Sequence, residues 1–375
     1  MPKTAFIYSA DMARYDLYPS HPLRPERLRM TYELASEYGL FGGESRLVEP
    51  SPAEEGDILS FHEPEYVHVV KDLSAEIPVP HQAIFGFGPG DNPPFQGMYE
   101  ASLLYTGASL KAADLVMRGE AERAFSISGG LHHAKPARAS GFCIFNDPVI
   151  AVKRLMQEFD RIAYIDIDVH HCDGVQEAFY DTGRVLTISI HESGDYLFPG
   201  TGDVQEIGEG EGKGFTANIP LAPGTPDDVY TQAFREVVPP LIAAYDPQVI
   251  VAQLGADSHF QDPLAHLNVT SAGFIDVVGS IVDFGKRLVA LGGGGYDISA
   301  VSRLWTLAYA YMTECELPDK IPPEFSSKYG LRRLRDSVAV ESIISDSQRA
   351  SVKDYADWKT RTAKELLFPL HGIGL

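Results

Sequence analysis

The sequence predicts an α/β fold with a single domain, in which a mainly parallel sheet carries helices on both faces. From residue 124 onwards, short apolar segments that end in polar or glycine-rich residues alternate with longer helical stretches. Such alternation is typical of parallel sheets, because each crossover connection places a helix on one face. No linker interrupts the middle of the 375 residues, and one large sheet can absorb that length.

The N-terminal part begins with a short strand over residues 4–9 and a helix that ends at Gly39. Pro25 suits the first turn of that helix, and Gly39 suits its C-terminal cap. A capping-box pattern over residues 51–54 begins the next helix. Residues 76–97 are too rich in Pro and Gly for regular structure, and loops of this length are usually functional rims or lids.

A helix over residues 98–118 leads into the alternating region, where the period of the apolar residues separates strands from helices. The predicted strands are residues 124–128, 162–169, 185–190, 249–254 and 288–291. The predicted helices are residues 147–158, 173–181, 226–245, 271–286 and 298–312. After Cys315 the sequence changes to Pro-rich joints, a basic patch over 328–335 and a charged helix near 346–367.

The composition excludes several classes of protein. A net charge of -21 argues against nucleic-acid binding, which requires a basic face, and suits either a cationic substrate or simple solubility. No apolar run approaches the ~20 residues of a membrane span, and the N-terminus lacks the apolar core of a signal peptide. We therefore expect a cytoplasmic protein that binds no membrane. The three cysteines show no paired spacing, so we expect reduced thiols.

The segment R-I-A-Y-I-D-I-D-V-H-H-C-D-G, residues 161–174, places Asp166, Asp168 and His170 at every second position. A strand points alternate side chains to one side, so we expect these three to converge. Buried carboxylates and an imidazole are costly unless a cation satisfies them. Pairing with Lys or Arg is the alternative, but Arg161 lies at the wrong end of the strand. The segment therefore predicts a metal site.

Open parallel sheets bind ligands outside the carboxyl ends of their strands, and this sequence gathers polar residues there. Those ends read S-G-G-L-H-H, D-V-H-H-C-D-G, H-E-S-G-D, G-A-D-S-H and G-G-G-G-Y-D. Asp168, His170 and Asp257 would supply three ligands and leave one position open, which is the pattern of catalytic zinc. A metal in such a site lowers the pKa of bound water from ~15.7 to around 7, so hydrolysis is the natural reaction class.

A hydrolytic site also needs groups that accept and donate protons. His132 and His133 follow two glycines at a strand end, and we expect their adjacent imidazoles to titrate as a coupled pair. Each needs a carboxylate behind it to fix its tautomer, and Asp166 and Asp173 are the candidates. Tyr296 follows a run of glycines, and its hydroxyl can stabilise an oxyanion. A phosphate-binding loop is the weaker interpretation of these glycines, because no Lys follows them.

Three residues near these motifs allow a simpler interpretation. Phe142 and Phe198 lie beside glycine or proline turns, where they suit either an apolar substrate slot or the ordinary core. Spacing alone does not separate these alternatives. Cys172 lies within the predicted metal segment, but the alternation of the ligands leaves it on the far side, so we expect it to pack in the interior.

The motifs G-G-L-H-H-A, G-F-C-I-F-N-D, D-I-D-V-H-H-C-D-G-V-Q-E-A-F, F-P-G-T-G-D, G-A-D and G-G-G-G-Y occur in this order. The sequence that carries them resembles the zinc-dependent histone deacetylase family, and it is most similar to the bacterial histone-deacetylase-like and acetoin-utilisation proteins. The similarity runs from near H-P-L-R-P-E-R to about residue 315. It implies an arginase-like α/β fold and removal of the acetyl group from an N-acetylated amine, typically acetyl-lysine.

The resemblance also implies roles for particular residues. It implies zinc ligands at Asp168, His170 and Asp257, an acid/base pair at His132 and His133 with partners Asp166 and Asp173, and a carbonyl-polarising Tyr296. It implies channel walls at Gly141, Phe142 and Phe198, a rim residue at Asp91, and an arginine of the cavity beneath the metal at Arg27. It implies a potassium site at Asp166, Asp168, His170, Ser189 and Ile190.

Two positions depart from the pattern of the family. Leu197 replaces an aromatic residue that several relatives carry beside the channel phenylalanine, and this would widen the mouth of the channel. Leu264 occupies the substrate-facing position where polyamine-selective relatives carry an acidic gatekeeper. Selective deacetylation of polyamines is therefore disfavoured.

We therefore expect a metal-dependent deacetylase of acetyl-lysine in proteins or peptides, with zinc or alternatively ferrous iron. Residues 1–315 would form the deacetylase domain, and residues 316–375 an extension packed on it. Small acetylated amines, polyamines and longer acyl groups stay open as substrates, and a homo-oligomer stays open as the assembly. A binuclear arginase-type hydrolase is disfavoured, because Cys172 stands where a further Asp would be needed. A non-catalytic acetyl-lysine reader is disfavoured, because every residue needed for turnover is present.

Overall fold

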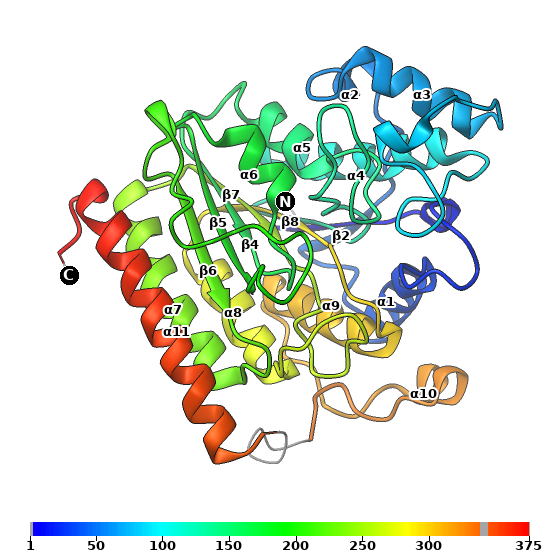
Figure 1. The fold of residues 1–375 in the computed structure, drawn as a ribbon. Coiled ribbons are helices and arrows are strands. Elements are labelled where there is room, and N and C mark those ends of the chain that lie inside the picture. Colours follow the sequence, from blue (N-terminus) through cyan, green and yellow to red (C-terminus); the bar gives the residue numbers. More distant parts are fainter. Residues whose placement is uncertain (1–2, 338–343, 375) are drawn as a thin grey trace.

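The computed structural model describes residues 3–337 and 344–374, and within them eight strands form one sheet in which every pair runs parallel (Figure 1). The strand order is β2-β1-β3-β8-β7-β4-β5-β6. The strands are β1 (Thr4–Ile7), β2 (Ser45–Val48), β3 (Arg123–Ser126), β4 (Ile162–Asp166), β5 (Val185–Glu192), β6 (Thr216–Leu221), β7 (Val249–Gln253) and β8 (Arg287–Leu291). The predicted parallel α/β architecture is confirmed.

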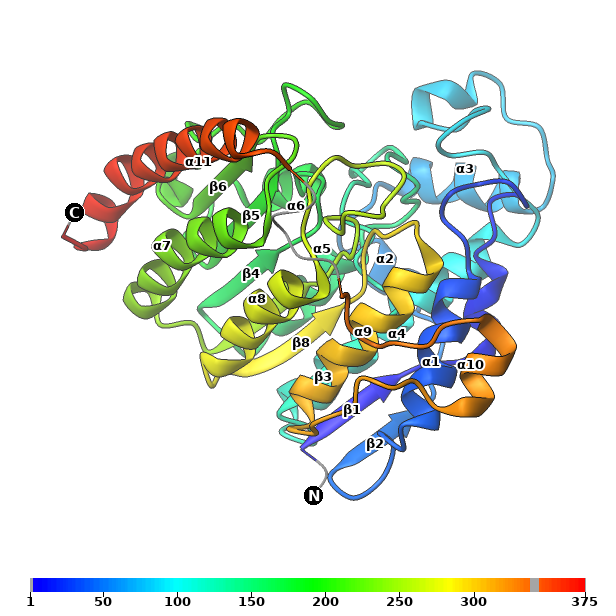
Figure 2. The same ribbon diagram turned by 90° about the horizontal axis from the view of Figure 1, so that it is seen from below.

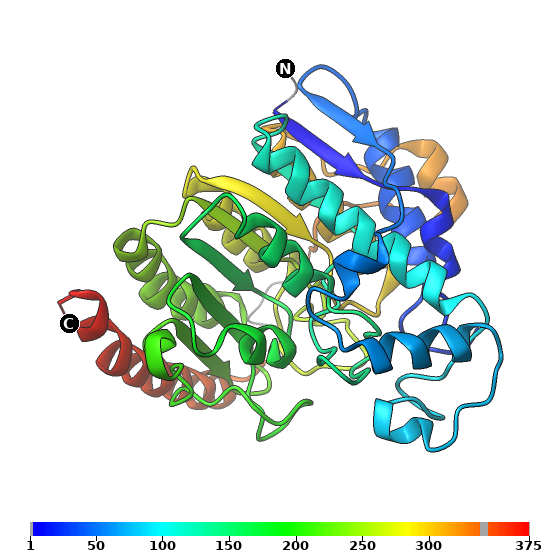
Figure 3. The ribbon, with the colours of Figure 1, turned by 90° about the horizontal axis from the view of Figure 1, so that it is seen from above.

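Helices cover both faces of the sheet (Figures 2 and 3). One layer, in the order of its neighbours, is α1 (Glu26–Glu37), α9 (Ile298–Met312), α8 (Ser271–Asp283), α7 (Asp227–Tyr245) and α11 (Asp346–Leu367). The other layer contains α3 (Pro64–Ser74), α4 (Met98–Met117), α5 (Asp147–Leu155) and α6 (Asp173–Phe179). The short helices α2 (Glu55–Ile58) and α10 (Pro323–Tyr329) lie outside these layers.

The central strands lie in the interior because of this double cover. Every residue of β4, β5, β6 and β7 is buried. Strands buried on both faces read as continuous apolar runs, and this is why the sequence reveals most of them. The polar residues that follow β3, β4, β7 and β8 meet at the carboxyl edge, as expected for parallel strands.

Two edge strands and two element boundaries differ from the sequence prediction. The sequence analysis did not predict β2 or β6, which form the two edges of the sheet. Pro220 lies within β6, and an edge strand tolerates proline because one of its sides forms no ladder. The helix expected from residue 51 begins at Glu55, because Glu54 and Asp57 form the capping box. The predicted strand 162–169 ends earlier, at Asp166.

The C-terminal region contacts the edge of the sheet through α11, which packs on β6 and α7. Two ion pairs hold α11 to α7: Lys364 with Glu236 at 2.6 Å and Arg349 with Asp228 at 2.6 Å. The predicted helix near 346–367 is therefore present, whereas the domain boundary at residue 315 stays a prediction. Among the described helices, none combines the length and apolar character needed to cross a bilayer.

Candidate metal centre

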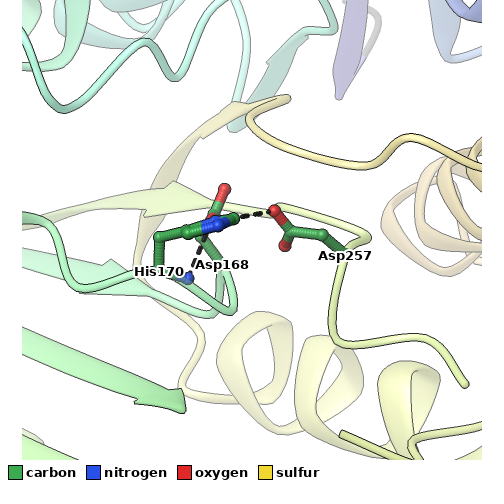
Figure 4. Close-up of side chains that lie close together, drawn as sticks. All are labelled: Asp168, His170 and Asp257. Atoms are coloured by element: carbon green, nitrogen blue, oxygen red, sulfur yellow. Dashed lines mark hydrogen bonds and ion pairs between the residues drawn. The ribbon is translucent and has the colours of Figure 1, made fainter. Parts of the chain in front are cut away.

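Asp168, His170 and Asp257 lie together at the carboxyl edge of the sheet, where β4 and β7 end (Figure 4). One ligand atom from each lies within 4.8 Å of the others, and all three residues are buried. His170 Nδ1 is 3.0 Å from Asp168 Oδ1 and 3.2 Å from Asp257 Oδ2. One imidazole nitrogen between two carboxylates is a donor set that suits zinc or ferrous iron.

Hydrogen bonds from side chains to the backbone, and not a continuous strand, bring these ligands together. Strand β4 ends at Asp166, so the N–H groups that follow are free to bond to side chains. Asp168 N donates to Asp166 Oδ1 at 3.0 Å, and His170 N donates to Asp168 Oδ1 at 3.0 Å. Each bond spans two residues, so the alternation predicted from the sequence continues past the end of the strand. Val169 N donates to Asp257 Oδ1 at 2.9 Å and ties in the third ligand.

The charges of the cluster fit a bound cation. Burial and the nearby Asp168 raise the pKa of Asp257 to about 7. Burial lowers the pKa of His170, but hydrogen bonds to Asp168 and Asp257 outweigh it and raise that pKa to about 10. The two carboxylates therefore share one positive neighbour, and a divalent ion would relieve their repulsion. A Cβ at Gly294 would collide with both carboxylates, so glycine leaves the room they need.

His132 and His133 lie beside this cluster, and each has its own carboxylate. His132 Nδ1 donates to Asp166 Oδ2 at 2.8 Å, and His133 Nδ1 donates to Asp173 Oδ1 at 2.7 Å. The two Nε2 atoms are 3.0 Å apart. Burial lowers both pKa values, but Asp166 and other carboxylates raise the pKa of His132 to about 9. Burial and His132 lower the pKa of His133 to about 3. The two imidazoles thus titrate as a pair.

Tyr296 and Phe142 lie over the cluster from one side. The Tyr296 ring is 6.4 Å from the His170 ring and 5.7 Å from the Phe142 ring. Phe142 has φ +69, a conformation that few residues other than glycine adopt. Tyr15 donates to the Phe142 carbonyl at 2.7 Å and helps to hold it there. This strained backbone points to a position that the surrounding structure fixes.

Phe198 and Gly141 lie beside His133. The Phe198 ring is 4.9 Å from the His133 ring and 6.4 Å from the His170 ring. A Cβ at Gly141 would meet both the His133 ring and the Phe198 ring, so glycine permits their close approach. The slot that the sequence left open as an alternative stays a prediction: the Phe142 ring packs on Tyr296, whereas the Phe198 ring packs on His133.

The remaining predicted residues lie farther from the cluster. Asp91 is exposed in the loop 76–97, and its backbone faces His21, whose ring contacts the Phe142 ring at 4.4 Å. Leu264 is half-buried, and its N–H donates to Asp262. Arg27 is buried and donates to the carbonyls of Gly293 and Gly295. Ser189 and Ile190 lie on β5, where Ser189 pairs with Asp166 of β4. Leu197 is partly buried against the core.

The sequence analysis missed two residues that hold the cluster. Gln253 donates to Asp168 Oδ2 at 2.7 Å and accepts from Gly255 N at 2.7 Å. Asp262 accepts from Tyr296 N at 2.7 Å and from Leu264 N at 2.9 Å, so it places the tyrosine near the metal ligands. Gln253 had a signal in the sequence, since it is a lone polar residue at the end of the apolar strand V-I-V-A-Q. Asp262 had only its position five residues after Asp257.

The fold and the site together define a class of protein. A buried Asp-His-Asp cluster occupies the ligand-binding edge of a parallel α/β sheet, next to two histidines that are each bonded to an aspartate. This arrangement fits a metal site of the kind that hydrolases use.

The comparisons with known proteins identify the family. The histone deacetylase domain model matches residues 21–312, and the chain belongs to the histone deacetylase family. It is 40% identical over 337 residues to the acetoin utilization protein AcuC of Bacillus subtilis, covering 88% of this chain and 87% of that protein. It is 39% identical over 330 residues to histone deacetylase 9 of Arabidopsis thaliana, covering 87% of this chain and 77% of that protein.

Solved structures agree with this assignment. A crystal structure of an HDAC homolog complexed with SAHA superposes with a TM-score of 0.87 at 32% identity, covering 96% of this chain and 100% of that chain. A crystal structure of an HDAC homolog from Aquifex aeolicus gives a TM-score of 0.86 at 32% identity, with the same coverage. The predicted family and the arginase/deacetylase-like fold are thus confirmed, and the protein is a family hydrolase of the deacetylase type.

Proposed function

We propose that this protein is a zinc-dependent deacetylase that hydrolyses the acetamide of N-acetyl-lysine in a peptide or protein, with release of acetate. One observation carries the proposal. A single cavity is lined by His132, His133, Asp168 and Tyr296, so the proton-transfer groups, a metal ligand and a phenol all face the same small space. Relatives named as histone deacetylases support the same reaction.

The residues divide the reaction among them. Asp168, His170 and Asp257 would hold the metal, which supplies a Lewis acid for the acetyl carbonyl and lowers the pKa of the attacking water. The histidine pair takes the proton of that water and returns one to the lysine nitrogen as the C–N bond breaks. Asp166 and Asp173 keep both imidazoles oriented, since each accepts from an Nδ1.

Tyr296 and the channel walls complete the proposed site. The Tyr296 hydroxyl donates to the carbonyl oxygen of the acetyl group as negative charge develops on that oxygen. Gly141, Phe142 and Phe198 contact the aliphatic part of the lysine, and Asp91 holds the substrate backbone at the rim. Leu264 offers no charge to a second amine, so we place polyamines below acetyl-lysine as substrates.

Three further parts of the proposal concern the surroundings of the site. Zinc is the favoured metal, with ferrous iron as the alternative for the same donor set. Oxygens at Asp166, Asp168, His170, Ser189 and Ile190 bind potassium. Residues 1–315 carry the deacetylase domain, and residues 316–375 form an extension that packs on it.

Replacement of Tyr296 by Phe tests the proposed reaction. The Tyr296→Phe variant loses the hydroxyl but keeps the ring, so we expect kcat for an acetyl-lysine peptide to fall by about 10²-fold or more. Acetate release and the metal content by elemental analysis are measured together. Replacement of the exposed Tyr311 by Phe serves as the control, because its hydroxyl bonds Asp283 away from the site. Undiminished turnover in Tyr296→Phe would refute the role of the phenol.

A further inference from the structure

The loop 193–203 forms one wall of the proposed channel, because it carries Phe198. It connects the end of β5 to the segment before β6 and contains no helix or strand. Phe198 is 42% exposed, and its ring is held only 4.9 Å from the His133 ring. The position of this loop therefore sets how far the Phe198 wall stands from the reacting groups.

Contacts from the sheet side hold the second half of the loop. His171 Nδ1 is 2.8 Å from Thr201 Oγ1, and His191 Nε2 donates to the Gly202 carbonyl at 3.0 Å. Glu206 accepts from Gly202 N at 3.1 Å. These bonds fix residues 201–202. At the start of the loop, the backbone of Ser193 is held by its N–H, which donates to the Leu221 carbonyl of β6 at 2.7 Å, and its side chain faces α11.

Helix α11 contacts both ends of the same loop. Tyr355 donates to Ser193 Oγ at 3.1 Å, and Lys359 donates to Asp203 Oδ2 at 2.9 Å. Ser193 and Asp203 are the first and last residues of the loop, and α11 lies along β6 beside them (Figures 1 and 2). The helix lies beyond residues 21–312, which the family model matches. The helix thus contacts the loop at both of its ends.

The environment of Lys359 shows that this contact is built into the fold. The residue is only 5% exposed, although lysine is rarely buried unless it is paired. Its ammonium lies 4.6 Å from the centre of the Trp358 ring and 5.6 Å from that of Tyr355, and its charge meets the Asp203 carboxylate. Burial of a charge is costly. The two rings belong to α11 itself, so the loop contributes the Asp203 carboxylate, the one charged partner among the three.

We propose that α11 braces the channel wall: Lys359 and Tyr355 are positioning residues that fix the ends of loop 193–203 and thereby set the acyl group that the site accepts. This inference deepens the proposed function and rests on it. A loosened brace lets the Phe198 wall move outward, so the channel holds the aliphatic part of the lysine less tightly and binding of the acetyl peptide weakens. Every acyl group passes this wall on its way to the reacting groups, so discrimination against longer ones falls as well.

The test compares two lysines of the same helix. Lys359→Met removes the ammonium but keeps an apolar stem, and Lys359→Arg restores a charge. Lys364→Met is the matched control, because Lys364 pairs with Glu236 of α7 and does not contact the loop ends. Tyr355→Phe deletes only the hydroxyl. KM and kcat are measured with acetyl-, propionyl- and butyryl-lysine peptides, and amide hydrogen exchange is followed at residues 194–202 in the protein with and without zinc.

We expect Lys359→Met to raise KM for the acetyl peptide about three- to tenfold with kcat nearly unchanged, to narrow the preference for acetyl over butyryl, and to speed exchange in the loop. Lys359→Arg should restore most of the wild-type KM, acyl preference and loop exchange. Lys364→Met should leave all three unchanged. In a background of Phe198→Ala the effect of Lys359→Met on KM should largely disappear.

Three results would overturn the brace: loop exchange and acyl preference unchanged in Lys359→Met, equal effects in Lys364→Met, or full additivity with Phe198→Ala. Failure of the proposed function looks different, because the wild-type protein would then release no acetate from any peptide. Loop exchange is still informative in that case, since it requires no turnover.

Discussion

The floor and the rim of the site are built in different ways. On the floor, the ligands Asp168 and Asp257 are buried, and backbone groups bond to them from several strand ends. At the rim, Asp91 and Phe198 lie on irregular loops, and both are exposed. The floor is rigid because many short contacts determine each atom, whereas the rim is set by a few side-chain contacts that cross long sequence distances.

This difference separates chemistry from specificity. Asp168 Oδ2 accepts from both Gly294 N and Gln253 Nε2 at 2.7 Å, so it cannot move without the loss of several bonds. The Phe198 ring, in contrast, packs against the rings of His133 and His170 and is 42% exposed. We therefore expect changes on the floor to affect metal binding and kcat, and changes at the rim to affect KM and acyl preference.

The largest effect should follow from the loss of a floor ligand. Asp257→Asn keeps the shape of the side chain but removes a charge, so we expect bound metal to fall well below one per chain and kcat to fall by about 10³-fold or more. Elemental analysis and acetate release measure both. A variant that is fully active without bound metal would contradict the proposal that the residues of the floor act through a metal ion.

A smaller effect should follow from Gln253→Leu, which leaves the ligands intact but removes a donor to Asp168. Loss of such outer hydrogen bonds typically costs about 10- to 100-fold in metal affinity, so we expect zinc to be removed by a weaker chelator. Gln232→Leu on the exposed face of α7 is the control. Equal zinc affinity in both variants would show that the floor tolerates loss of its hydrogen bonds.

At the rim, Phe198→Ala should act on binding alone. We expect KM for the acetyl-lysine peptide to rise about three- to tenfold, with kcat within about twofold of wild type. Tyr196→Ala, at an aromatic that is 59% exposed on the same loop, should change KM much less. A large loss of kcat in Phe198→Ala would contradict the assignment of Phe198 to the rim, because a loss of kcat is the effect expected for residues of the floor.

The smallest expected effect is on the free energy of unfolding. It concerns Asp336, which links the C-terminal region to His259, two residues after Asp257. Asp336 accepts from His259 Nε2 at 3.0 Å and from Arg303 at 2.8 Å. Burial alone would raise its pKa, but His259, Arg303 and Ser271 outweigh burial and lower it. The native protein therefore binds fewer protons here than the unfolded chain, and the stabilisation is present above about pH 5 and fades as pH falls.

Asp336→Asn removes this contribution. We expect its free energy of unfolding to lie about 1–3 kcal/mol below wild type at pH 7, with the gap beginning to narrow as pH falls below about 4 and narrowing further at pH 3. Denaturant titrations between these pH values measure the difference. A gap that stays constant with pH would mean that packing at Asp336, and not its charge, stabilises the contact.

Much of the floor could be predicted from the sequence, whereas much of its support could not. The alternation of Asp166, Asp168 and His170 is a local pattern, and it persists because bonds between residues two apart continue it beyond β4. Gln253 donates to Asp168 although the two residues are 85 positions apart in the sequence, and a local pattern cannot predict a contact between residues so far apart. The sequence analysis missed the edge strands β2 and β6 because strands at an edge carry polar residues or proline, and this interrupts the apolar run that reveals a buried strand.

The sequence by itself determined the parallel α/β class and pointed to the Asp168, His170 and Asp257 cluster and the histidine pair, because short-range periodicity places polar groups at strand ends. Only the tertiary structure decided that the Phe198 ring packs on His133, that Asp262 holds Tyr296, and that α11 reaches the ends of loop 193–203. Lys359 and Asp203 are separated by 156 positions, and a contact of that kind exists only once packing has brought distant elements together.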